Sequence, residues 1–171
     1  MTEPLVLIPG MMCNERLFQP QVAAFSSKRP VTVVVPKGSS SMAGLAQAVL
    51  ATAPPRFALA GLSLGGIVAM QIIRQAPERV SRVALLDTNP LPDPPDKAPI
   101  REAQVEKVRR GALDEVMRDE MKPNYLAPGT RKQETLNLCM EMAEALGPDV
   151  FVKQSRALQR RRDQQATLRK I

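Results

Sequence analysis

The residues in this sequence that are best suited to chemistry form the pentapeptide Gly61-Leu62-Ser63-Leu64-Gly65. An apolar run over 57–60 leads to it, and an apolar segment over 64–76 follows at once. Where a strand turns abruptly into a helix, the corner residue is strained, and side chains at the flanking positions would clash. The pattern therefore predicts that Ser63 stands exposed above a sheet as a nucleophile. A tight turn with Ser63 as a helix cap is the alternative interpretation.

Two backbone N–H groups are candidates for stabilising the oxyanion that attack by Ser63 would create. The N–H of Leu64 begins the following helix, where unpaired donors and the helix dipole favour negative charge. The tight turn Ile8-Pro9-Gly10-Met11-Met12 follows the first apolar run and can direct the Met11 N–H to the same point. The alternative interpretation of this turn is a Pro-Gly sequence that only ends a strand.

The residue that would activate the serine is missing, because the sequence contains no histidine. Without a general base, a serine hydroxyl is a poor nucleophile at neutral pH. Asp87 ends the apolar run 82–87 and is a candidate acid, although an aspartate there is more often an ordinary polar residue at a strand end. An acid alone does not replace the base, and no lysine stands in a Ser-x-x-Lys arrangement around Ser63. We therefore expect only weak turnover from this chain alone.

Strand-like and helix-like segments alternate along the chain around these residues. Four short runs are almost wholly apolar, as a parallel sheet buried on both faces requires: 4–8, 31–35, 57–60 and 82–87. Between them lie segments with apolar residues at helical spacing: 14–25, interrupted by Pro20, then 40–53 and 64–76. Strands and helices in this alternation predict an α/β fold with a mostly parallel sheet and flanking helices.

The composition changes at about residue 90. The segment 89–99 contains five prolines and is expected to be a linker or hinge. Four helices are expected after it, at 100–110, 112–121, 130–146 and 149–162. We therefore predict two domains, a core over 1–90 and a helical lid, or cap, over 91–171. Four methionines of the lid are interpreted as flexible packing that would suit a hydrophobic pocket over Ser63: Met117, Met121, Met140 and Met142.

The chain carries a net charge of +7, and residues 153–171 hold seven basic side chains against Asp163 alone. This basic stretch lacks interleaved aromatic residues, so we expect no nucleic-acid partner. A solvated helix face is the better interpretation, formed by Lys153, Arg156 and Arg160. The apolar residues of the same helix, Ala157 and Leu158, would then face the lid.

The two cysteines, Cys13 and Cys139, lie far apart and outside any CxxC or Cys/His spacing. We therefore expect two buried or half-buried free thiols, with neither a metal nor a cofactor. The N-terminus, MTEPLVLIPGMM, has an acidic residue where a signal peptide would be positive, and its apolar run is too short for a membrane span. These features predict a cytoplasmic protein that is not inserted in a membrane.

The sequence resembles the α/β-hydrolase family, specifically compact, esterase-like members that start at the strand before the oxyanion loop. The matching pieces are LVLIPGMM, VTVVVP and FALAGLSLGGIVAMQIIRQAPERVSRVALLDTNP, with a looser match over 91–171 as a lid. The resemblance implies Ser63 as the nucleophile, the Leu64 and Met11 amides as the oxyanion hole, and esters or related acyl compounds as substrates. Pro9 stands where many relatives have a histidine that is not catalytic.

In that family the acid and then the histidine follow the nucleophile, on loops beyond the lid. The present sequence ends at ATLRKI, where the family's next strand would begin. The resemblance therefore implies an N-terminal portion of a hydrolase: a truncated gene product, a cloned fragment or one product of a split gene.

Three functions are compatible with these observations. The first is a serine hydrolase whose catalytic domain is incomplete in this chain. The second is a non-catalytic binding or regulatory module that kept the elbow around Ser63. The third is an interaction protein, whose exposed sheet edge self-associates or pairs with a second chain that supplies the histidine and aspartate. Hydrolase, acyltransferase and cofactor-free peroxidase chemistries share this elbow, so the reaction type stays open.

Overall fold

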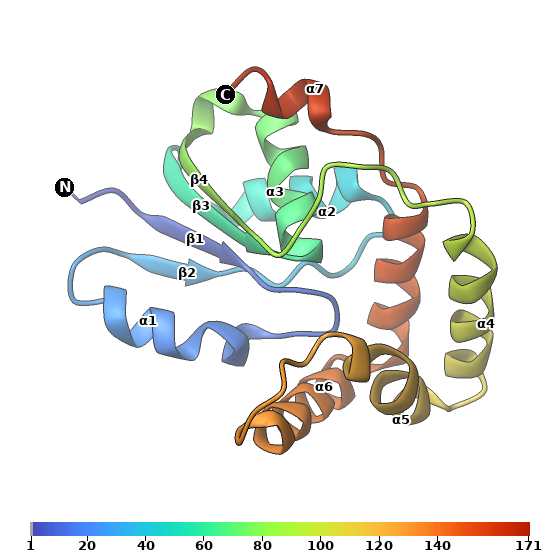
Figure 1. The fold of residues 1–171 in the computed structure, drawn as a ribbon. Helices are drawn as coiled ribbons and strands as arrows, with labels where there is room; N and C mark the ends of the chain where they lie inside the picture. The colour runs from blue at the N-terminus through green and yellow to red at the C-terminus, as the bar shows by residue number, and fades with distance from the viewer. Residues whose placement is uncertain (1) are drawn as a thin grey trace.

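A four-stranded parallel sheet forms the centre of the computed structural model, which describes residues 2–171 (Figure 1). Its strands are β1 (Leu5–Ile8), β2 (Val31–Val33), β3 (Phe57–Leu62) and β4 (Val80–Leu86), in the order β2-β1-β3-β4. All neighbouring strands run parallel. Each strand overlaps one of the predicted runs, although β3 continues through the second residue of the pentapeptide. The predicted α/β fold class with a mostly parallel sheet is confirmed.

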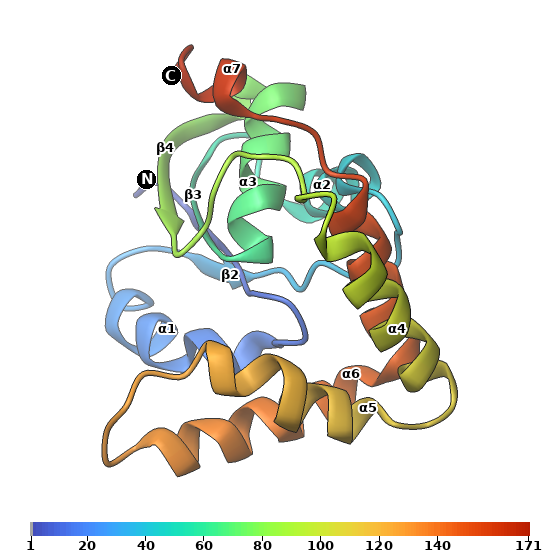
Figure 2. The same ribbon diagram turned by 45° about the vertical axis from the view of Figure 1, so that its right-hand side comes forward.

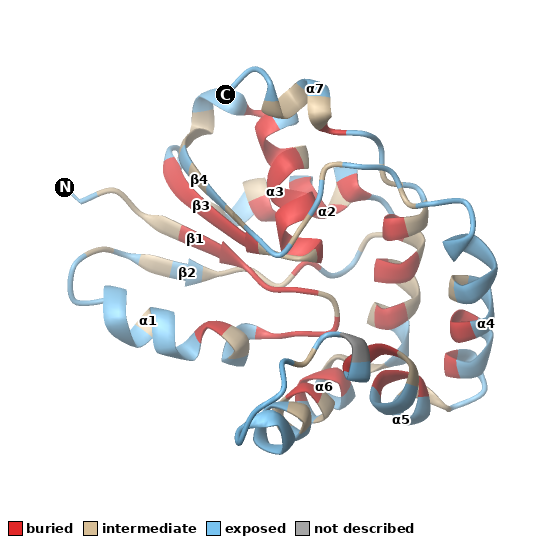
Figure 3. Ribbon diagram, viewed as in Figure 1, coloured by how far each residue is buried: buried red, intermediate tan, exposed pale blue. Residues whose placement is uncertain are grey.

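The central strands, β1 and β3, are buried on both faces of the sheet, as Figure 3 shows by their red colour. Val6 and Ile8 of β1 pack into the main core cluster on one face. Leu7, between them, packs with Phe18 on the opposite face. Because successive side chains of a strand point to opposite faces, a strand covered on both sides must be apolar throughout.

Helices cover the two faces of the sheet. A short 3₁₀ helix, η1 (Glu15–Phe18), and α1 (Gln19–Phe25) lie against one face, while α2 (Met42–Thr52) and α3 (Leu64–Gln75) lie against the other (Figures 1 and 2). The segment 14–25 is divided between η1 and α1, as the interruption at Pro20 predicted, and Pro20 lies in the first turn of α1. A proline is tolerated there, since the N–H that it lacks would have no partner in the helix.

The edge strands β2 and β4 are less buried than the sequence predicted. Each pairs with a neighbour on one side only, and their side chains alternate between half-buried and exposed. The exposed residues of β4 are Arg82, Ala84 and Leu86, and Leu86 is 42% exposed. This face of β4, named here the open face, belongs to no apolar cluster of the described residues, although the Glu3 carboxylate lies 3.7 Å from Arg82. Burial on both faces is therefore right for the central strands and wrong for the edges.

Short helical segments follow the proline-rich linker and lie beyond the carboxyl ends of the strands (Figure 2). They are α4 (Lys97–Arg109), α5 (Leu113–Glu115), the π-helix η3 (Val116–Met121) and the 3₁₀ helix η4 (Lys122–Asn124). Before the linker, the 3₁₀ helix η2 (Pro77–Arg79) joins α3 to β4. The helix predicted at 112–121 is therefore divided between α5 and η3.

Buried apolar side chains of these segments form a cluster, named here the cap core. Met117 and Met121 of η3 belong to it, together with Phe151 and with Met12 from the loop after β1. Met140 packs against it, and Met142 is buried in a neighbouring cluster. Three of the four methionines are thus buried and Met140 is partly buried, so their predicted role in packing is confirmed, whereas a pocket over Ser63 stays a prediction. Because Met12 is a member, the cap core is continuous with the loop after β1.

The helix α6 (Lys132–Gln159) contains both helices predicted near the C-terminus. Gly147, with φ 79° and ψ 173°, is not helical and separates its two halves, and Pro148 starts the second half. A short helix that the sequence did not predict, α7 (Gln165–Leu168), follows. Among residues 2–171 no helix is both long and apolar enough to cross a membrane.

The second half of α6 packs on the main core rather than on the lid alone. Ala157 is fully buried and Leu158 is nearly so, and both belong to the same cluster as the apolar residues of β1, β3, α2 and α3. The prediction that these two residues face the lid was wrong, because the return of α6 to the sheet is a long-range contact. The division into a core over 1–90 and a lid over 91–171 stays a prediction.

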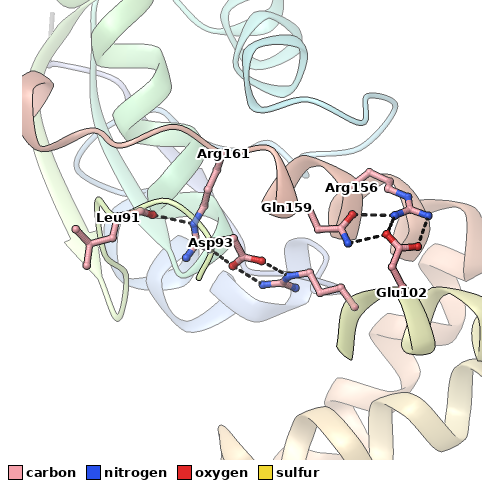
Figure 4. A network of polar contacts seen from close by, with 7 residues as sticks. Leu91, Asp93, Glu102, Arg156, Gln159 and Arg161 are labelled. Carbon is pink, nitrogen blue, oxygen red and sulfur yellow. Dashed lines mark hydrogen bonds and ion pairs between the residues drawn. The ribbon is translucent and has the colours of Figure 1, made fainter. Parts of the chain in front are cut away.

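A buried ionic group ties the proline-rich linker to α4 and to the end of α6 (Figure 4). Asp93 accepts hydrogen bonds from Arg101 at 2.6 and 3.0 Å and lies 3.3 Å from Arg161, which also donates to the Leu91 carbonyl at 2.9 Å. The side chains of Asp93 and Arg161 are only 6% and 9% exposed. Burial lowers the pKa of the Arg161 guanidinium, an effect that Asp93 opposes and Arg101 reinforces.

A second polar contact joins α4 to α6. Glu102 binds Arg156 and Gln159, and these hydrogen bonds hold the pKa of the Glu102 carboxyl at about 2 (Figure 4). Arg156 is therefore engaged with the neighbouring helix, and the solvated face predicted for it is only partly solvated.

Both cysteines are free and buried, as the sequence predicted. Cys13 and Cys139 lie in one apolar cluster with Met142. Burial raises the pKa of the Cys13 thiol to about 11, although the nearby Lys122 acts in the opposite direction. This thiol is therefore protonated at neutral pH and is a poor nucleophile.

Candidate active site

Ser63 lies at the corner between β3 and α3, and its backbone is strained as the pentapeptide predicted. Its φ of 51° falls in the left-handed region, where a residue with a side chain costs about 1–3 kcal/mol. The N–H of Ser63 donates to the Leu86 carbonyl at 2.9 Å, and the Thr88 hydroxyl donates to the Ser63 carbonyl at 2.8 Å. The end of β4 thus holds the corner on both sides. The sequence alone did not identify Thr88, because a threonine after a strand has no distinguishing pattern.

The glycines of the pentapeptide allow backbone segments to approach closely around Ser63. A Cβ at Gly65 would overlap the Ile8 carbonyl and lie 2.7 Å from the carbonyl oxygen of Pro9. A Cβ at Gly61 would overlap the backbone of Gly65 itself. The first turn of α3 therefore lies directly on the end of β1, and only glycine leaves room for it.

Replacing Gly65 by alanine is expected to lower the free energy of unfolding by about 3 kcal/mol, because the added methyl group meets backbone atoms that cannot move aside. Gly38→Ala is a matched control, since Gly38 has a φ of 93° and nothing lies within 4 Å of its added Cβ. We expect about 1 kcal/mol there, from backbone strain alone. Urea denaturation followed by circular dichroism measures both changes. Equal losses would contradict a steric role for Gly65.

The order of the strands brings the loop after β1 beside Ser63. The chain leaves β1 for β2 on one side and returns to β3 on the other, so the sheet reverses between β1 and β3. Ligands of open α/β sheets bind at the carboxyl ends of the strands at such a switch point. A Cβ at Gly10, in that loop, would lie 3.6 Å from the Cβ of Ser63. The two elements singled out in the sequence therefore meet at one place.

The groups predicted to form the site make no hydrogen bonds to other described residues. In the described part of the chain, the N–H groups of Met11 and Leu64 have no hydrogen-bond acceptor. The Ser63 hydroxyl likewise has no partner among the described residues, and Ser63 is half-buried. An acyl carbonyl oxygen placed between the two N–H groups could accept a hydrogen bond from each.

The loop after β1 is itself strained and held by a residue that the sequence did not reveal. Met12 has a φ of 56°, the left-handed value that favours glycine. Its N–H donates to Oε1 of Gln154, from the second half of α6, at 2.9 Å. A glutamine between Lys153 and Ser155 gives no signal of such a partner, because the contact spans most of the chain.

Asp87 follows β4 directly, is exposed and has a φ of 42°. Its neighbour Leu86 binds the Ser63 N–H, so the backbone brings Asp87 to the elbow. The described residues contain no cluster of acidic and thiol side chains that could hold a metal ion. A surface hollow of about 470 Å³, lined by the end of α3 and by α7, does not include Ser63.

Known proteins similar to this chain include several hydrolases, although no family model matches it. In an alignment of 94 residues that covers 50% of the chain, it is 38% identical to the pimeloyl-[acyl-carrier protein] methyl ester esterase of Aliivibrio salmonicida, and the match spans 36% of that relative. The chain thus covers little more than a third of the length of this curated relative.

Solved structures extend the likeness to nearly the whole chain. The enol-lactonase from Burkholderia xenovorans LB400 has a TM-score of 0.83 at 18% identity, over 95% of this chain and 67% of its own. The esterase from Thermogutta terrifontis has a TM-score of 0.80 at 22% identity, over 95% of this chain and 65% of its own. The parallel sheet, its strand order and these likenesses together show that the chain has the α/β-hydrolase fold.

Proposed function

We propose that this chain supplies the nucleophile and the oxyanion hole of a serine hydrolase that acts on esters or related acyl compounds. One observation carries the proposal: Ser63, in its left-handed corner, lies beside a loop whose Met11 N–H is unpaired, as is the N–H of Leu64. A nucleophile and two unpaired donors at the switch point of the sheet are what acyl transfer requires.

In the proposed reaction the Oγ of Ser63 forms a bond to the acyl carbon while the hydroxyl proton passes to a base. The carbonyl oxygen becomes an oxyanion, which the N–H groups of Met11 and Leu64 stabilise. Collapse of this intermediate breaks the bond to the alcohol oxygen, and the alcohol leaves with the proton from the base. Water then repeats the sequence on acyl-Ser63 and releases the carboxylic acid.

The base of this reaction must come from outside the 171 residues, because none of them is histidine. We assign Asp87 the role of an acid that orients an incoming imidazole, since it follows the residue that binds the Ser63 N–H. A second chain is the proposed source, and the open face and unpaired edge of β4 support pairing with it. A stable monomer in solution would argue against this pairing. The two free thiols favour a reducing compartment such as the cytoplasm.

The cap and the curated relative, of which the chain covers 36%, support the substrate class that we propose. The name of the relative specifies a methyl ester on a carrier-bound acyl group. We extend only the ester class to this chain. The cap core beside Met12 is apolar, which supports an apolar acyl chain.

A non-catalytic acyl-binding module is the second candidate, and the absence of histidine favours it. Such a module would use the same two N–H groups to hold a carbonyl oxygen, without forming a bond to Ser63. The two candidates differ in whether Ser63 reacts.

A fluorophosphonate probe separates the two candidates. The Ser63 oxygen displaces fluoride from phosphorus, and its proton passes to solvent. We expect labelling that is at least about 100-fold slower than for a complete triad, because the base is missing, but located at Ser63 by peptide mass. Ser63→Ala removes the label, and Ser27→Ala, at an exposed serine, retains it. Label spread evenly over the serines would contradict the hydrolase, and fast labelling would contradict the missing base.

A further inference from the structure

The second half of α6 carries a glutamine whose amide joins three parts of the molecule. Gln154 is fully buried; its Oε1 accepts the Met12 N–H at 2.9 Å, and its Nε2 donates to the Pro36 carbonyl at 2.7 Å. Met12 lies 142 positions away along the chain, and Pro36 lies 118 away. Buried amides are bonded at both ends where they fix a particular arrangement of neighbours. Gln154 therefore connects the cap helix to the loops after β1 and β2.

The bond to Met12 acts on the turn that carries Met11. The Cys13 N–H donates to the Gly10 carbonyl at 3.1 Å and closes this turn. Met12 has a positive φ and Met11 has not, which is the arrangement of a type II turn with methionine where glycine is favoured. The type I form would relieve the strain by flipping the peptide between the two methionines. That flip would turn the Met12 N–H away from Gln154.

We propose that Gln154 is a positioning residue for the oxyanion hole. By holding the Met12 N–H it fixes the peptide between the two methionines. A turn fixed at that peptide limits the movement of the adjoining Gly10–Met11 peptide, whose N–H is the proposed oxyanion donor. The bond to Pro36 orients the amide so that its oxygen, and not its nitrogen, faces Met12. The inference rests on the proposed function for the role of Met11. A displacement of the second half of α6 would release the turn, which links the cap to the site.

Selective labelling with [¹⁵N]methionine tests the turn itself, because the chain has only nine methionines. In Gln154→Leu, which removes both hydrogen bonds at similar volume, we expect the exchange protection of the Met12 N–H to fall about tenfold or more. The Met11 signal should shift or split. The matched control is Gln164→Leu, since Gln164 is 2% exposed and its amide bonds Gln71 and Thr167 instead. Signals of Met11 and Met12 that are the same in Gln154→Leu and the wild type would overturn the proposal.

Binding of butylboronic acid tests the effect on Ser63. The Ser63 oxygen adds to boron, its proton passes to solvent, and the tetrahedral adduct places one boron oxygen in the oxyanion hole. We expect Gln154→Leu to weaken binding about tenfold and Gln164→Leu less than about twofold. Unchanged affinity in Gln154→Leu would overturn the positioning role. A wild type that does not bind boronate would contradict the proposed function instead, and the methionine spectra would then decide on Gln154.

Should Gln154→Leu not fold, Gln154→Glu keeps the length and the acceptor. A protonated glutamic acid can donate to Pro36 and accept from Met12, whereas the carboxylate can only accept. We expect Met11 signals like those of the wild type at low pH, and shifted signals once the carboxyl ionises. The wild type should show no such change over the same range. Met11 signals in Gln154→Glu that do not vary with pH would overturn the proposal.

Discussion

Imidazole added to this protein is expected to accelerate the Ser63-dependent cleavage of 4-nitrophenyl butyrate by about tenfold to hundredfold. A positioned general base contributes about 10²- to 10⁴-fold, and a base that diffuses from solution recovers only part of this because it is not held in place. The chain offers a serine at a strained corner and no histidine, so imidazole supplies the group that is missing. Release of 4-nitrophenolate at fixed pH measures the rate.

The control for this experiment must account for the direct attack of imidazole on the ester. Ser63→Ala at the same imidazole concentration gives that background, and Ser27→Ala is a matched serine substitution at an exposed position. The additional rate should vanish in Ser63→Ala and persist in Ser27→Ala. If all three proteins respond to imidazole alike, Ser63 is not a positioned nucleophile and the binding module is the better account.

Replacing Asp93 by alanine is expected to lower the free energy of unfolding by about 3–5 kcal/mol, the cost of leaving buried charges without their partner. Asp93 binds both Arg101 and Arg161, and its side chain is 6% exposed (Figure 4). Without its carboxylate, the two guanidinium groups, whose side chains are only 18% and 9% exposed, repel one another. Because domains are stable by only about 5–15 kcal/mol, this single change removes a large part of the total.

Asp96→Ala is the matched control, since Asp96 lies in the same linker, is exposed and makes no side-chain hydrogen bond to the start of α4. Its removal is expected to change stability by no more than about 0.5 kcal/mol. Urea denaturation of the three proteins gives the comparison. If Asp93→Ala unfolds at the same urea concentration as Asp96→Ala, the ionic group does not hold the linker in place.

Local sequence was sufficient to predict the strands, the helices that flank them and the elbow. A strand buried on both faces needs an unbroken apolar run, and β1 and β3 have one. The need for glycine at positions 61 and 65 could also be predicted from local sequence. A Cβ at Gly61 would overlap backbone atoms only four residues along the chain, and a Cβ at Gly65 would overlap the end of the neighbouring strand β1. The roles of Ser63, Met11, Leu64 and Asp87 stay predictions.

The predicted burial of individual residues was wrong where it depends on long-range contacts. The alternation of strands and helices does not state which strand lies at an edge, so the exposure of Leu86 on β4 could not be read from its apolar run. Leu158 was predicted to face the lid and lies in the main core, because Gly147 redirects the second half of α6 toward the sheet.

The alternating α/β pattern, the strained serine corner and the absence of a histidine to activate it could therefore be predicted from the order of the residues alone. These depend on residue type and near-neighbour spacing, which set backbone sterics and side-chain alternation. The polar contacts that hold the site and the linker became apparent only in the folded molecule: Thr88 on the Ser63 carbonyl, Gln154 on the Met12 N–H, and Asp93 between two arginines of the linker group. Each is a polar contact whose partner is remote in sequence or unmarked by any pattern. Its free energy exists only after the chain has folded and excluded water.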